Sequence, residues 1–168
     1  MTLLVAGVSG DTIWMVADTL ITGLLGRRHD EHQIKVVPSE DGKALIGFAG
    51  EQLHGTKAIE YARKMPAGAS VLTHLLEVQR SYPIDFAYGY IDISGPHLFW
   101  LSGGSAKEVP VLHLGVESAF EQFQTIRHRD EIDPVPKAIA TFMMGTRSND
   151  KPPEALPSLD NGNATIIL

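Results

Sequence analysis

The chain opens with the sequence TLLVAGV at residues 2–8, followed by SGD at residues 9–11 and TIWMVA at residues 12–17. The two apolar runs have the length of β-strands, and the Ser-Gly-Asp segment between them is typical of a tight turn. The second run is therefore expected to return beside the first. We predict that the chain begins with a β-hairpin.

Similar patterns recur farther along the chain. Asp41-Gly42 marks a turn between two more apolar runs, which predicts a second hairpin. Residues 28–33 are polar and are expected to form a surface excursion before that hairpin. The predicted strands span residues 2–8, 12–17, 34–37, 44–48, 86–93, 97–101, 109–114 and 164–168.

Four segments repeat their apolar or small residues at helical spacing. These predicted helices span residues 51–65, 70–82, 115–126 and 133–143. Ser70 is the expected N-cap of the second helix, which Tyr82-Pro83 ends. Strands, two helices, more strands, two more helices and a last strand follow one another in the order of a layered α+β domain.

The composition indicates one globular domain over residues 1–168, with 43% hydrophobic and 20% charged residues. A formal net charge of −6 argues against nucleic acid as a partner, because phosphate binding requires concentrated Lys and Arg. The absence of cysteine excludes disulfides and thiolate nucleophiles.

Location and metal binding are constrained by two further features of the sequence. No apolar run reaches the length of a membrane span, and no charged region precedes the first strand, so a cytoplasmic protein without a membrane partner is expected. Most of the seven histidines are isolated. His29 and His32 lie in an acidic stretch that a polar surface loop explains, and no metal site is expected.

Thr2 carries the strongest chemical signal in the sequence. A threonine hydroxyl is a weak nucleophile that needs a nearby base, and a free α-amine on the same residue can serve as that base. The ammonium of Lys35 would bias this amine toward its neutral form, and Asp18 is the candidate partner for the lysine. The arrangement requires removal of Met1, because an amide nitrogen cannot act as a base.

Several motifs occur in the order found in one known family. They are the segments 2–7, 17–19 with 22–23, 34–36, 46–50, 96–99 and 103–105. With these motifs the chain resembles the N-terminal nucleophile hydrolases, specifically the proteasome β-subunits and their bacterial relatives. The resemblance covers nearly the whole chain and implies a four-layer αββα sandwich of two mainly antiparallel sheets.

The resemblance also implies roles for individual residues. Thr2 would be nucleophile and base, Asp18 and Lys35 the supporting pair, and the Gly47 amide an oxyanion-hole donor. The backbone at Thr22 would pair with an extended peptide. Leu45 and Ala49 would line a pocket for a medium apolar side chain. The implied protein is a threonine peptidase without a cofactor, acting on peptides or proteins within a homo-oligomeric ring, with an ATPase as a candidate partner.

Two other functions remain open at the level of the sequence. A catalytically inactive subunit with a structural or assembly role is favoured by Met1, and by Val116-Glu117-Ser118 where the family has Gly-Ser-Gly before its third helix. The family also has an aspartate and a serine near its last strand, and residues 157–162 offer these residue types at a different spacing. A small-molecule amidase is the third alternative, because one fold hosts several chemistries.

Overall fold

The computed structural model describes residues 3–17, 34–115, 117 and 121, together with the backbone of residues 20–22, 28–32 and 164–167. In chain order the elements are β1 (Leu3–Ser9), β2 (Thr12–Ala17), β3 (Leu20–Thr22), β4 (Arg28–His32), β5 (Val36–Pro38), β6 (Ala44–Gly50), α1 (Gln52–Ala62), α2 (Ala69–Ser81), β7 (Ile84–Asp92), β8 (Gly95–Ser102), β9 (Ser105–Glu108), β10 (Val111–Gly115) and β11 (Ala164–Ile167).

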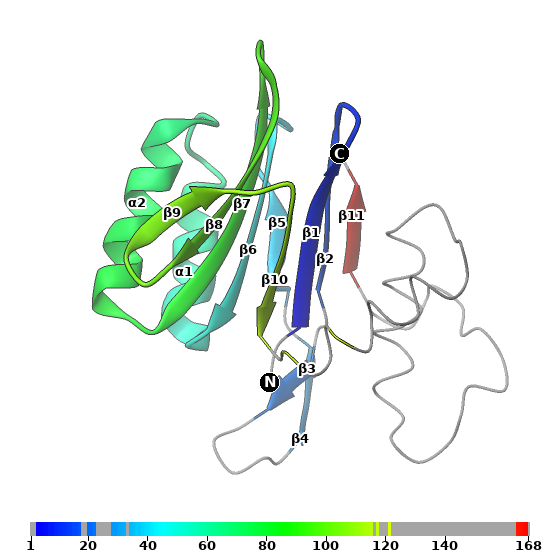
Figure 1. Cartoon of the computed structure of the whole chain (residues 1–168). Helices are drawn as coiled ribbons and strands as arrows, with labels where there is room; N and C mark the ends of the chain where they lie inside the picture. The colour runs from blue at the N-terminus through cyan, green and yellow to red at the C-terminus, as the bar shows by residue number, and fades with distance from the viewer. Residues whose placement is uncertain are drawn as a thin grey trace, which may run out of the picture.

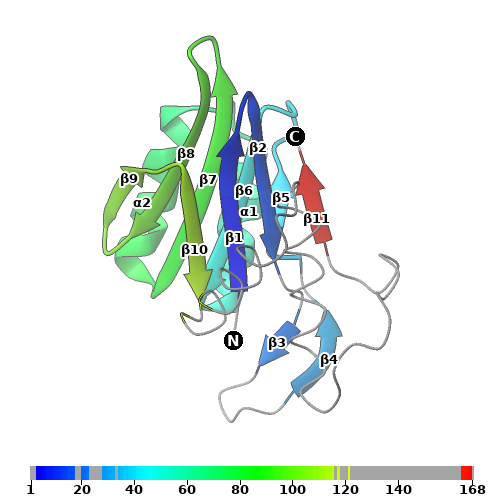
Figure 2. The same cartoon turned by 45° about the vertical axis from the view of Figure 1, so that its right-hand side comes forward.

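Two antiparallel sheets and two helices dominate the described part of the fold (Figure 1). One sheet has five strands in the order β5-β6-β7-β8-β9, and the other has four in the order β10-β1-β2-β11. A separate two-stranded ribbon pairs β3 with β4 (Figure 2). The mixed α+β class expected from the sequence is therefore confirmed.

The opening hairpin is present as predicted. β1 and β2 pair from Leu4 opposite Ala17 to Ser9 opposite Thr12, so that two residues remain in the turn. Gly10, the first of these, has a φ of 57°, a conformation that glycine adopts without the steric penalty of a Cβ atom. The turn residues thus determine the register that places Leu4 and Ala17 side by side.

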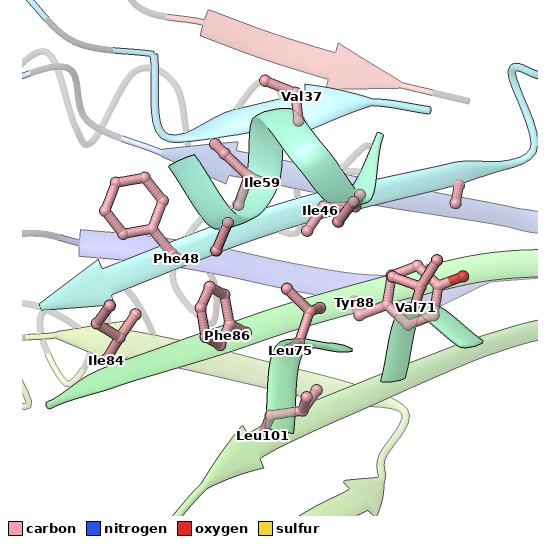
Figure 3. Packing of buried hydrophobic residues seen from close by; sticks show 13 residues of the cluster. Val37, Ile46, Phe48, Ile59, Val71, Leu75, Ile84, Phe86, Tyr88 and Leu101 are labelled. Carbon is pink, nitrogen blue, oxygen red and sulfur yellow. The ribbon is translucent and has the colours of Figure 1, made fainter. Parts of the chain in front are cut away.

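The five-stranded sheet is covered on one face by α1 and α2 and on the other by the four-stranded sheet (Figure 1). Side chains alternate between the faces of a strand, and β6 follows this rule. Ile46 and Phe48 lie in the core against the helices, which Figure 3 displays, whereas Leu45 and Ala49 lie in the core between the sheets. Both cores depend on β6.

The two helices bury one face each through residues at helical spacing. In α1 the carboxylate of Glu51 caps the first turn by accepting from the N–H groups of Leu53 and His54, at 3.1 and 2.8 Å. In α2 the buried residues Val71, Leu75 and Gln79 lie four positions apart. This spacing brings the polar Gln79 into line with the apolar face.

Ser70 does not cap the second helix, contrary to the expectation. The helix begins at Ala69, and its N-cap is Gly68, which has a φ of 136° and makes no side-chain capping bond. Ser70 is already in the first turn, where its hydroxyl lies 3.5 Å from the Pro66 carbonyl. The phenol oxygen of Tyr88 instead accepts from the Gly68 N–H at 2.7 Å, and burial raises the pKa of Tyr88 to about 12.

Three strands were not expected from the sequence, namely β3 with three residues, β4 and β9. Residues 28–32, predicted as a polar excursion, form β4, and β9 contains four exposed residues at the edge of the five-stranded sheet. β4 and β9 lack the apolar alternation that sequence patterns detect, and β3 is too short to show one; all three pair through backbone groups. The predicted helices over 115–126 and 133–143 lie outside the described residues, apart from Gly115, Glu117 and Glu121. The expected last strand is confirmed as β11, paired with β2.

The outer face of the four-stranded sheet is also apolar and buried. Leu4, Ala6 and Met15 belong to the core between the sheets. Val5 lies between Leu4 and Ala6, and Trp14 directly precedes Met15, so both side chains point to the outer face. Val5 is 1% and Trp14 4% exposed, so both faces of this sheet are covered. In the described residues, no helix combines the length and apolar character that crossing a membrane would require.

Candidate functional site

Gly47 is the point at which three segments of the predicted site meet. An ideal Cβ atom on Gly47 would lie 2.4 Å from Leu4 Cδ1, 3.2 Å from Val36 Cγ2 and 3.4 Å from the Lys35 carbonyl oxygen. Leu4 is fully buried and pairs with Ala17 across the first hairpin. The start of β1, the end of β2 and the start of β5 therefore converge on this glycine.

Lys35 lies at the same place with little contact with solvent. It precedes β5 directly, is 5% exposed, and its carbonyl oxygen accepts from the Phe48 N–H at 3.2 Å. Lys35, Ser39 and Gln79 are the buried polar or charged residues in the described part of the chain. Burial of an ammonium is costly unless it is paired, so a lysine at this position has more than a solubilising role.

Thr2 and Asp18 lie outside the described residues, so their predicted contacts with Lys35 are not tested. Their chain neighbours are described. Leu3 pairs with Gly115 at the end of β10, and Ala17 lies opposite Leu4. The chain thus enters β1 and leaves β2 at one end of the four-stranded sheet, the end that contains Gly115.

Of the three predicted substrate-binding residues, Ala49 borders a pocket. Thr22 is the last residue of β3, where it pairs with Arg28. Leu45 is fully buried in the core between the sheets. Ala49 is 8% exposed and belongs to the same core, but it also borders a pocket at the open end of the sandwich.

The pocket has a volume of about 650 Å³ and opens between four parts of the chain. Its walls come from the end of β6, the segment that joins α2 to β7, the turn between β8 and β9, and the end of β10. The described residues that line it are Ala49, Gly50, Gln79, Arg80, Tyr82, Pro83, Ile84, Asp85, Gly103, Gly104 and Gly115. Because Gly115 is the partner of Leu3, the pocket lies at the end of the sandwich where β1 begins.

Gly50 borders this pocket and was not selected from the sequence. Neighbouring residues of an antiparallel strand direct their N–H groups to opposite sides. Since the Phe48 N–H faces β5, that of Gly47 faces its partner Ala87 in β7, and that of Gly50 faces the β5 side. Gly50 ends β6 with a φ of 120°. Its position directly before the helix N-cap Glu51 was the available signal.

A second polar cluster lies at the turn between β7 and β8. His97 Nδ1 is 2.7 Å from Glu108 Oε1, and His97 Nε2 is 2.7 Å from Ser94 Oγ. The hydrogen bond to Glu108 raises the pKa of His97, with Asp92 contributing. The Ser94 hydroxyl donates to Asp92 Oδ1 at 2.6 Å, so its proton is directed away from the imidazole. The cluster stabilises the turn and does not present an activated serine.

The comparisons with known proteins assign no family to this chain. No protein-family model matches it, and a search of curated proteins finds no match. Within the described residues, no group of three His, Asp or Glu side chains is placed to hold a metal ion. The described features that bear on function are the packing around Gly47 and the pocket that Ala49 and Gly50 border.

Proposed function

We propose that this protein is an N-terminal threonine amidohydrolase that cleaves peptide bonds. The observation that carries the proposal is the burial of Lys35, whose carbonyl oxygen lies beside Gly47, where the start of β1 also meets β6. A buried lysine in the segment that precedes β5 supports the proposal, because the chemistry of an N-terminal nucleophile needs a nearby cation. A pocket of about 650 Å³ begins at the same end of the sandwich.

In the proposed reaction, the Thr2 hydroxyl oxygen attacks the carbonyl carbon of the scissile bond and its proton passes to the α-amine of the same residue. The positive charge of Lys35 keeps that amine neutral, and Asp18 balances the lysine. Because the Gly47 N–H faces Ala87 within the β6–β7 ladder, the donor proposed for the developing oxyanion is the Gly50 N–H, which faces the β5 side. The leaving amine takes the proton, and water hydrolyses the resulting ester.

The four-layer αββα arrangement is part of this proposal. A helical layer and two sheets are described, and the outer face of the four-stranded sheet is apolar and buried. A second helical layer on that face would complete the sandwich. We also propose a homo-oligomeric ring that acts on peptides or proteins, with an ATPase as candidate partner. Exposed Leu53 and Tyr61 on α1 favour an assembly, and a monomer by light scattering would contradict it.

Hydrolysis of a fluorogenic peptide mixture tests the proposed activity. The protein must first lack Met1, as measured by intact mass. Thr2→Ala is expected to abolish turnover and Lys35→Met to lower it at least about 100-fold, which is the scale of a lost general-base contribution. Lys43→Met is the matched control, because Lys43 is an exposed lysine in the turn before β6. Equal loss of activity in both lysine variants would contradict the role given to Lys35.

One observation favours the alternative of a catalytically inactive subunit. The glycine at position 47 is fully explained by packing, since Leu4 occupies the space of a Cβ atom. On that alternative the cluster around Gly47 joins the two sheets and has no further role. Thr2→Ala would then leave every measured property of the protein unchanged, including its assembly.

A further inference from the structure

Asp85 is a carboxylate placed inside the pocket at the open end of the sandwich. It follows Ile84 in β7 and lies directly opposite Ala49 of β6, which also borders the pocket. Ile84, Phe86 and Tyr88 face the helices, so the alternation of the strand places Asp85 on the other face. Its side chain is partly buried.

The position of this carboxylate is held by Gln79. The Gln79 Nε2 atom lies 3.3 Å from Asp85 Oδ1 and donates to the carbonyl oxygens of Ile84 and Leu101 at 3.0 and 2.8 Å. The Gln79 Oε1 atom accepts from the Gly104 N–H at 3.0 Å. These contacts join α2, β7, β8 and the turn before β9, so the wall that carries Asp85 is fixed before any ligand arrives.

Asp85 retains acceptor capacity toward the pocket. An ionised carboxylate offers about four acceptor sites, and the contact with Gln79 uses one. Among the described residues no cationic side chain lies within ion-pair distance of Asp85. Arg80 also lines the pocket but is exposed. A partly buried carboxylate in a pocket favours a cationic group in the ligand.

We propose that this pocket binds a cationic side chain, of arginine or lysine, in a peptide, and that Asp85 determines this preference. The inference rests on the proposed peptidase function for its role in the reaction, since the pocket adjoins the start of β1. From the sequence, Leu45 and Ala49 were expected to line a pocket for a medium apolar side chain. Ala49 borders the present pocket and Leu45 does not, whereas the carboxylate of Asp85 lines it.

Ligand binding tests this proposal without any turnover. The probes are Nα-acetyl-arginine amide and its neutral isostere Nα-acetyl-citrulline amide, titrated into the full-length protein and followed by NMR. The arginine probe is expected to bind at least about fivefold more tightly, which corresponds to about 1 kcal/mol for a partly exposed ion pair. Equal affinity for the two probes, or no binding of either, would overturn the inference.

Three variants identify the residue responsible. Asp85→Asn keeps an acceptor for Gln79 and should remove the preference for the arginine probe. Arg80→Gln removes a like charge and should tighten binding of that probe, an expectation that stands even if Asp85→Asn fails to fold. Asp11→Asn, in the exposed turn between β1 and β2, should change nothing. A preference that survives in Asp85→Asn overturns the assignment.

The outcome for the pocket is separate from the outcome for the proposed activity. If the arginine probe binds through Asp85 but Thr2 is unreactive, the pocket is a cation site and the peptidase proposal fails. If Thr2 reacts and both probes bind equally, the peptidase proposal stands and the role of Asp85 is wrong.

Discussion

Substitution of Gln79 by methionine should destabilise the protein by about 2–4 kcal/mol. Gln79 is 9% exposed, and its amide group lies within hydrogen-bond distance of four polar atoms in β7, β8 and the turn before β9. Methionine has a similar length and adapts to irregular spaces. The variant therefore removes the polar contacts while largely preserving the packed volume.

The magnitude follows from the groups left without Gln79. The carbonyl oxygens of Ile84 and Leu101 are buried acceptors, and an unsatisfied buried group costs about 1–3 kcal/mol. Leu101 lies in the β7–β8 ladder and retains a share of its bonding there, so its cost is at the low end. Gly104 is in an exposed turn where water can replace the lost acceptor.

Urea unfolding followed by circular dichroism measures this loss. For a chain of 168 residues, each kcal/mol corresponds to about 2–4 °C in Tm, so a parallel decrease of about 4–16 °C is expected. Gln52→Met is the matched control, because Gln52 is exposed in the first turn of α1, and it should change stability by less than about 0.5 kcal/mol. A loss below about 1 kcal/mol for Gln79→Met would show that the carbonyl oxygens of Ile84 and Leu101 do not depend on Gln79.

Two further predictions concern packing and pH. Gly47→Ala should lower the free energy of unfolding by about 1–3 kcal/mol in urea, because the added methyl group overpacks against Leu4. The double variant with Leu4→Ala should lose less than the sum of the two single losses. Full additivity would contradict the close approach of Leu4 to Gly47. His97 has a raised pKa, first through Glu108, so its stabilising contribution is complete below its ordinary pKa of 6.5 and is lost as pH rises through the higher folded value. The stability difference between the native chain and His97→Gln, at most about 1 kcal/mol for a surface pair, should therefore shrink between about pH 5.5 and 8.5, and a difference that grows over this range would contradict the assignment.

The sequence predicted those parts of the fold in which apolar spacing determines structure. The β1–β2 hairpin and both described helices are confirmed, because their buried residues recur at the spacing of a strand or a helix. β9 was missed because its residues are exposed and only its backbone pairs. Gln79 was not identified in advance, since a glutamine at helical spacing resembles a surface residue until its four partners are in place.

The site was predictable to a similar extent. Lys35 and Gly47 were selected from motif order, and the structure brings them together. Asp85 and Gly50 were not, because a pocket depends on how distant segments meet: Asp85 and Gly115 are far apart in sequence and border the same space. Such a meeting has no local pattern for sequence analysis to detect.

Covalent labelling shows directly whether Thr2 is an N-terminal nucleophile. The assembled protein without Met1 is incubated with a peptide epoxyketone or boronate, and the adduct is located by intact mass and peptide mapping. We expect one adduct per chain at Thr2, absent in Thr2→Ala and formed much more slowly in Lys35→Met. A processed, folded protein that forms no adduct, or an adduct that persists in Thr2→Ala, would contradict the role of Thr2 as nucleophile.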